Sequence, residues 1–233
     1  MSTFPDTHHS LVEALQSPDR GERERAIELV ARVYREPVIA VVMHKWGHQR
    51  ADAEDLAHDF LLQAFDKEWF ARYDASRGRF RTFLRACLVA FAGTRAEAAS
   101  RLKRGGTVRH VAIEDVDIAA VDDTLDALFE REWARSVLTG AVDALRADCD
   151  TAGRGSTFAV FVAHDIDGAD ADSPPTYASL ASDFSIPITQ VTNYLNWARR
   201  RFREHVLSTL RALTTSDAEF RAEARALLGV DIP

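Results

Sequence analysis

The sequence lacks the features that mark secreted and membrane-spanning proteins. It has only two cysteines, Cys87 and Cys149, which are too few for a disulfide framework. No apolar run approaches the length of a membrane-spanning helix. The first ten residues, MSTFPDTHHS, lack the basic and apolar regions of a signal peptide. We therefore expect a cytoplasmic protein with no membrane partner.

Motifs that carry catalysis are also missing. The sequence has no glycine-rich phosphate loop, no G-x-S-x-G and no paired cysteine and histidine. His44 and His48 are four residues apart and could share a helical face toward a metal, with His58 as a third candidate, but no Cys or Glu completes a known motif. The segment DIDGADAD has its glycine at the fourth position instead of the sixth position of a calcium loop. We expect no enzyme activity, no metal site and no cofactor.

The bulk composition is that of a globular protein. A chain of 233 residues suits one large domain or two small ones, and 46% hydrophobic residues are enough to build a core. The formal net charge of −7 argues against binding nucleic acid over the whole surface. It leaves room for a local basic site, because binding responds to the local field more than to the total charge.

Apolar residues recur at helical spacing through most of the chain, which predicts an all-α fold. After a tail over residues 1–19, residues 20–106 form a first helical domain, in which we expect Pro37 to start a new segment or to kink a long helix. Residues 113–132 then carry eight acids against Arg131 alone, which predicts an acidic linker over residues 107–123 that runs into a new helix. Residues 124–213 form a second helical domain, and residues 214–233 are a tail with an amphipathic helix of unknown role.

An unusually basic strip, residues 77–109, begins in the first domain of this acidic protein and extends into the predicted linker. Glu97 is its only acid. Three aromatic residues, Phe80, Phe83 and Phe91, are interleaved with the basic ones. Unpaired bases could stack on them. Their spacing, however, is typical of a buried helix face, and we favour this interpretation. The basic residues are Arg77, Arg79, Arg81, Arg85, Arg95, Arg101, Lys103, Arg104 and Arg109.

The second domain contains a helix-turn-helix pattern over residues 176–206. A short apolar helix is followed by SIPI as the turn, and Pro187 lies near the start of the second helix, where its missing N–H costs little. The second helix has one apolar stripe, and the opposite face carries amides and arginines. Such a helix can enter the major groove of DNA. The alternative is a helical hairpin with a solvated basic end.

Two segments, taken together, resemble the extracytoplasmic-function (ECF) sigma factors. ADAEDLAHDFLLQAF…RYDASRGRFRTFLRACL…RLKRGG resembles their region 2, and TYASLASDFSIPITQVTNYLNWARRRFRE resembles their region 4. The similarity covers about residues 20 to 212 and is closest to the subgroup with a KRGG end to region 2 and an FEREWA-like start to the region 4 half. It implies a dissociable promoter-recognition subunit of bacterial RNA polymerase, associated with the nucleoid, with region 2 and region 4 as the two helical domains.

The resemblance implies a contact with the −10 promoter element through the basic strip, where arginines would neutralise phosphates of the melting strand. When DNA is absent, the acidic linker is a candidate to screen or occupy the strip. The predicted −10 contacts are Arg77, Arg79, Arg81, Arg85, Arg95, Arg101, Lys103 and Arg104.

The resemblance also implies contacts with the polymerase core, its β′ and β subunits, and with the −35 element. Acidic residues at the start of one helix would dock on the coiled coil of β′; the alternative is a solvated helix start that favours the helix dipole. These residues are Asp52, Glu54, Asp55 and Asp59. In the second helix of region 4, amides would read bases and arginines would meet phosphates. The predicted −35 residues are Gln190, Thr192, Asn193, Asn196, Arg199, Arg200 and Arg203.

Some positions depart from the family pattern and motivate a second hypothesis. An Arg-Asn pair and an aspartate of region 2, the glycine of the turn and two basic positions of the recognition helix are replaced. The replacing residues are Val89, Ala90, Thr94, Ser185, Thr192 and Tyr194. The alternative function is a sigma-like regulatory protein that binds a protein partner without selecting promoters. Candidate regulators of either kind are an anti-sigma factor, a Ser/Thr kinase or another protein.

Overall fold

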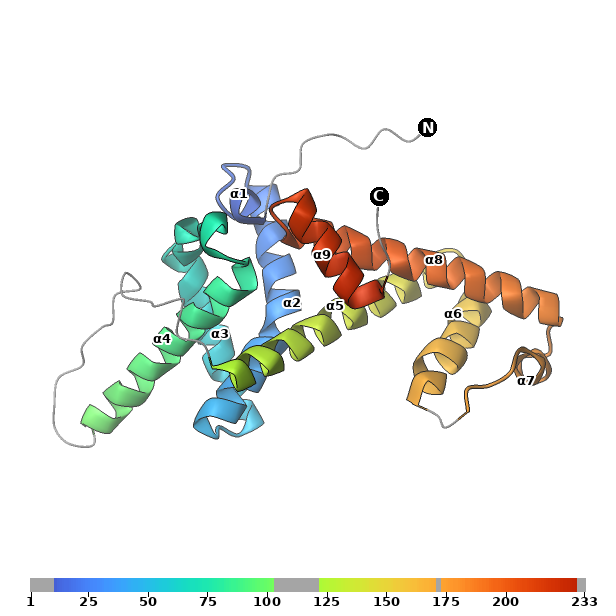
Figure 1. The fold of residues 1–233 in the computed structure, drawn as a ribbon, viewed down its shortest axis with the longest axis horizontal. Helices are drawn as coiled ribbons and strands as arrows, with labels where there is room; N and C mark the ends of the chain where they lie inside the picture. The colour runs from blue at the N-terminus through green and yellow to red at the C-terminus, as the bar shows by residue number, and fades with distance from the viewer. Residues whose placement is uncertain (1–10, 103–121, 171–172, 230–233) are drawn as a thin grey trace. The chain divides into compact units, whose positions relative to one another are not determined.

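The computed structural model describes residues 11–102, 122–170 and 173–229. Every regular element within these ranges is helical, and no β-strand occurs in them (Figure 1). The predicted all-α class is confirmed for this part of the chain. The chain divides into two compact units. We call them unit 1 (Met1–Ser136 with Ala212–Phe220) and unit 2 (Val137–Arg211 with Arg221–Pro233).

The border between the units falls inside a helix. The predicted linker, residues 107–123, lies outside the described residues up to position 121. Helix α5 (Asp123–Thr151) begins at the last residue of the predicted linker. Its residues up to Ser136 belong to unit 1 and those from Val137 belong to unit 2. Within unit 1, the acidic side chains of Asp126 and Glu130 at the start of α5 pair with Arg85 and Arg81 of α4. The predicted domain boundaries themselves stay a prediction.

Unit 1 is built from four helices together with the first half of α5. The helices are α1 (Leu11–Leu15), α2 (Arg20–Trp46), α3 (Arg50–Asp66) and α4 (Phe80–Leu102). Two 3-10 turns, η1 (Trp69–Arg72) and η2 (Ala75–Arg77), connect α3 to α4. The side chains of Phe80, Phe83 and Phe91 are 2%, 6% and 8% exposed, so the predicted buried face of this helix is confirmed.

Local signals fix both ends of α2. The Asp19 carboxylate accepts a hydrogen bond from the Glu22 backbone N–H at 2.7 Å and caps the helix start. Gly47, with φ 67°, ends the helix in the left-handed conformation that glycine tolerates, and its N–H donates to the Met43 carbonyl. For Pro37 the sequence predicted either the start of a new segment or a kink in a long helix. No new segment starts there, because α2 runs through Pro37, which is buried.

Unit 2 combines the second half of α5 with a series of shorter elements and one long helix. These are α6 (Gly155–Phe161), the π-helical turn η4 (Val162–Ile166), η5 (Asp167–Asp170), α7 (Tyr177–Asp183) and α8 (Ile188–Leu213). Two buried clusters hold them together: Leu145, Cys149, Phe161 and Ala198 form one, and Val160, Leu180, Val191 and Leu195 form the other. The last helix, α9 (Asp217–Leu228), accounts for the helix predicted in the tail, and its residues divide between the units.

Candidate functional site

The structure has the predicted succession of helix, turn and helix at α7 and α8. Thr176 caps α7 by accepting a hydrogen bond from the Ser179 N–H at 3.1 Å. The Pro187 carbonyl accepts from the Gln190 N–H at 2.8 Å at the start of α8. Ser185 has φ 52°, a left-handed conformation that costs a non-glycine residue about 1–2 kcal/mol. The turn therefore has a backbone conformation that glycine adopts most readily, and here a serine adopts it.

Four of the predicted −35 residues form one exposed stripe on α8. They are Asn193, Asn196, Arg200 and Arg203, and they succeed one another at spacings of three and four residues. On the opposite side of α8, Val191 and Leu195 are fully buried. The stripe thus presents two amides and two guanidinium groups to solvent on the face that a groove-binding helix would use.

The other three predicted −35 residues are engaged within the protein. The Gln190 amide donates to the Tyr194 hydroxyl at 2.6 Å, and the Thr192 hydroxyl donates to the Ile188 carbonyl at 3.3 Å. Arg199 donates through Nε and Nη2 to the two carboxylate oxygens of Asp165, both at 2.7 Å. Arg199 was predicted to contact phosphate; in the structure it forms an ion pair with Asp165 of η4, and its contact with DNA stays a prediction.

The Arg199 pair is the centre of a polar cluster that joins η4, α7 and α8. His164 Nδ1 lies 2.7 Å from Asp165 Oδ1, and Arg199 Nη1 donates to the Tyr177 hydroxyl at 3.3 Å. Burial raises the pKa of Asp165, but hydrogen bonds from Arg199 and His164 outweigh it, so this pKa lies below its ordinary value. No sequence signal pointed to this cluster, because Asp165 and Arg199 are 34 residues apart.

Two arginines of the basic strip are buried, which corrects their predicted contact with DNA. Arg81 and Arg85 are 5% and 4% exposed. Arg81 pairs with Glu130 and Arg85 with Asp126, both from the start of α5. The Arg81 guanidinium also lies 4.3 Å from the centre of the Trp133 ring. Arg81 and Arg85 are four residues apart on α4, and their partners Asp126 and Glu130 are also four residues apart. This matched spacing is a sequence signal for two ion pairs between the helices.

The remaining strip residues have different surroundings. Arg77 and Arg79 are exposed at the turn before α4. Arg95 donates to Asp59 Oδ2 at 2.6 Å and lies over the Phe91 ring at 5.1 Å. The side chain of Arg101 and the residues Lys103, Arg104 and Arg109 lie outside the described part of the chain, so their contacts stay predictions.

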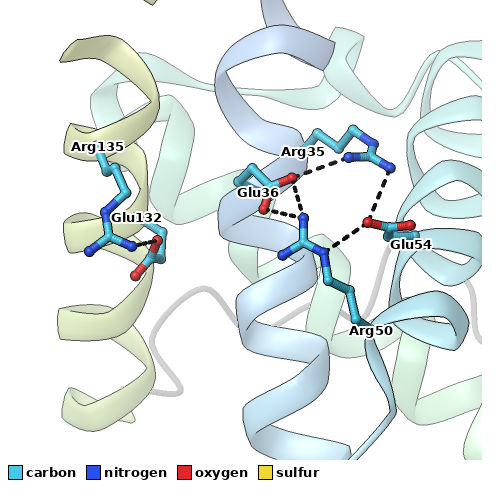
Figure 2. A network of polar contacts seen from close by, with 6 residues as sticks. All are labelled: Arg35, Glu36, Arg50, Glu54, Glu132 and Arg135. Atoms are coloured by element: carbon cyan, nitrogen blue, oxygen red, sulfur yellow. Dashed lines mark hydrogen bonds and ion pairs between the residues drawn. The ribbon is translucent and has the colours of Figure 1, made fainter. Parts of the chain in front are cut away.

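The predicted polymerase-docking acids divide into engaged and available residues. Glu54 accepts a hydrogen bond from Arg50 Nε at 2.9 Å and lies 3.8 Å from Arg35 Nη2, within the ion-pair network that includes Glu36 (Figure 2). Asp59 is paired with Arg95. Asp52 and Asp55 are exposed on α3 and have no ion pair among the residues that the structure describes. They are the acids that an approaching partner would meet first.

The two histidines considered for a metal do not share a helical face. His44 is in the last turn of α2, which ends at Gly47, so His48 lies beyond the helix. Within the described ranges, no three histidine, cysteine or acidic side chains come together to hold a metal ion. In the same ranges no helix is both long and apolar enough to cross a membrane.

No protein-family model matches the chain, and no curated protein or solved structure matches it either. The resemblance to ECF sigma factors therefore rests on the motifs of regions 2 and 4 alone.

Proposed function

We propose that this chain is an ECF-type sigma factor, which binds core RNA polymerase and directs promoter recognition. The observation that carries the proposal is the exposed stripe of Asn193, Asn196, Arg200 and Arg203 on the second helix of a helix-turn-helix. Amides can pair with the N6 and N7 edge of adenine, and arginines with phosphates. The polymerase performs the chemistry, and this chain supplies promoter choice without a catalytic residue of its own.

Docking on the polymerase is assigned to α3. Asp52 and Asp55 offer uncompensated negative charge to a basic partner surface, and Leu62, 50% exposed two turns after Asp55, offers an apolar contact. The exposure of Arg77 at the start of the basic strip supports a contact with DNA near the −10 element. Such a protein acts in the cytoplasm, at the nucleoid.

A sigma-like protein that binds a protein partner without selecting promoters is the second candidate. It is favoured by the loss of three strip residues to internal contacts: Arg81 and Arg85 are buried, and Arg95 is paired with Asp59. Under this function the exposed stripe of α8 would face a protein instead of a groove.

Transcription from a library of genomic fragments, with purified core polymerase and with or without this protein, tests the proposal. We expect protein-dependent transcripts whose upstream regions share two sequence elements at a fixed spacing. Co-elution with the core but no protein-dependent transcript would favour the second candidate. If there are no protein-dependent transcripts and no co-elution with the core, the sigma-factor proposal is wrong.

A further inference from the structure

Two arginines outside the predicted sites are held on aromatic rings at the surface of unit 2. The Arg146 guanidinium lies 5.0 Å from the centre of the Phe158 ring, and that of Arg154 lies 4.7 Å from the centre of the Trp197 ring. Both arginines are exposed, and neither has an ion pair with a carboxylate in the described ranges. A cation–π contact orients a guanidinium without neutralising its charge. These side chains are therefore oriented by the rings and keep their charge.

The fold places Arg154 beside the exposed stripe of α8. Trp197, on which Arg154 lies, is one helical turn from Asn193 and about one turn from Arg200. The ring packs on the buried cluster that joins the end of α5 to α6 and α8. Gly153, with φ 64°, makes the turn after α5, and the Arg154 N–H closes it on the Cys149 carbonyl at 2.7 Å.

Some neighbouring acids on the same elements are already paired, whereas Asp143 and Asp150 of α5 are exposed. Asp148 is bound by Arg201 at 2.6 Å and by His205 at 2.8 Å. Glu204 is bound by Arg201 at 2.7 Å and approaches Arg200 at 4.0 Å. Arg146 and Arg154 form no ion pair with any of these acids in the described ranges, so their guanidinium groups stay open to solvent.

We propose that Arg146, near the end of α5, and Arg154, in the turn between α5 and α6, bind phosphates of the DNA duplex that α8 reads. This inference rests on the proposed function. A loop between the first two helices also contacts the DNA backbone in homeodomains, where a later helix reads the major groove. The two arginines would position α8 on the duplex without reading sequence, because phosphate contacts carry no base identity.

The salt dependence of DNA binding by the full-length chain tests this assignment. The probe is a random-sequence duplex of about three helical turns, and the variant is Arg146→Ala combined with Arg154→Ala. We expect weaker binding at low salt and a log–log salt slope reduced by about one unit per lost phosphate contact. The matched control removes two exposed arginines from the same helix, Arg131→Ala with Arg135→Ala, and we expect it to keep the wild-type slope.

The outcomes separate this inference from the proposed function. A wild-type slope in the Arg146 and Arg154 variant, with a reduced slope in Arg200→Ala, overturns the phosphate contact and leaves the role of α8 standing. No salt-dependent binding by the wild type overturns both. Circular dichroism checks whether the alanine variant is folded. If it is not, Arg154→Lys provides a second test: it keeps the charge and should retain most of the salt slope.

Discussion

The guanidinium of Arg81 on α4 is buried against the carboxylate of Glu130 on α5. One turn farther along α4, Arg85 pairs with Asp126, which lies one turn earlier on α5. Since the order of the partners is reversed, the two helices run antiparallel where they meet. Because of this contact, two arginines of the basic strip pack within unit 1 instead of facing solvent.

Replacing Glu130 should destabilise unit 1. Glu130→Gln leaves the buried Arg81 guanidinium without its carboxylate, and we expect the free energy of unfolding to fall by about 1–3 kcal/mol, as for other hydrogen bonds to charged groups. Urea denaturation followed by circular dichroism measures the change. Glu24→Gln removes an exposed partner of Arg20 and should change stability by less than about 0.5 kcal/mol. Equal effects of the two variants would contradict a structural role for the buried pair.

Variants of the same contact test whether acidic residues cover the basic strip when DNA is absent. Asp126→Asn with Glu130→Gln neutralises both partners but keeps Trp133 over Arg81. We expect unchanged affinity for single-stranded DNA, because packing as well as charge covers the arginines. A clear rise in affinity would instead mean that α5 moves away and releases them.

Charge reversal on α3 should abolish association with the polymerase. Asp52→Lys with Asp55→Lys changes the two exposed acids that have no ion pair in the described part of the chain, so helicity should be kept. We expect loss of co-elution with the β′ subunit. Asp143→Lys with Asp150→Lys, at exposed positions of α5, makes the same change in net charge and should co-elute normally. If the α3 variant still co-elutes, the docking assignment is wrong.

Asn193 and Arg200 should contribute to DNA binding in different ways. Asn193→Ala should relax the preference at one or two base pairs, with a loss of about 1–3 kcal/mol of discrimination and little change in salt slope. Arg200→Ala should weaken all sites alike. Selection from a randomised −35 library measures both. Gln190→Ala is the control, because its amide is already bound to Tyr194; an Asn193→Ala profile equal to that of the wild type would favour the protein-binding candidate.

The cluster around Asp165 should make unit 2 sensitive to acid. Burial raises the pKa of Asp165, yet hydrogen bonds from Arg199 and His164 hold it below its ordinary value. The stability from this lowered pKa is complete above the unfolded pKa of about 3.9 and is lost as the pH falls through the folded one. Asp165→Asn should lower the urea midpoint at neutral pH and flatten its fall below about pH 4. Asp167→Asn, an exposed neighbour, should keep the wild-type profile; equal profiles for both variants would contradict the assignment.

The two thiols should be unreactive in the folded protein. Burial raises the pKa of Cys87 to about 12, and burial also raises that of Cys149. Because the thiolate is the reactive form, labelling near pH 8 should be slow in buffer and complete for both cysteines in denaturant. Rapid labelling of Cys87 without denaturant would show that the α4 core opens readily.

Much of the fold could be predicted from the sequence, because its signals are local. The start and end of α2, the turn at Ser185 and Pro187, and the buried face with Phe80 depend on residues within a few positions of one another. Periodicity likewise predicted the exposed amides of Asn193 and Asn196. The sequence by itself thus determined where the helices lie and which faces are apolar.

Only the tertiary structure decided which charged residues are available. Arg79 and Arg81 are both arginines of the basic strip. Yet Arg79 is exposed, whereas Arg81 is 5% exposed and pairs with Glu130, 49 positions away. Arg199 and Arg200 are adjacent on α8, but one faces Asp165 and the other faces solvent. An ion pair depends on the distance between side chains from different helices, and this distance is set by how the helices pack.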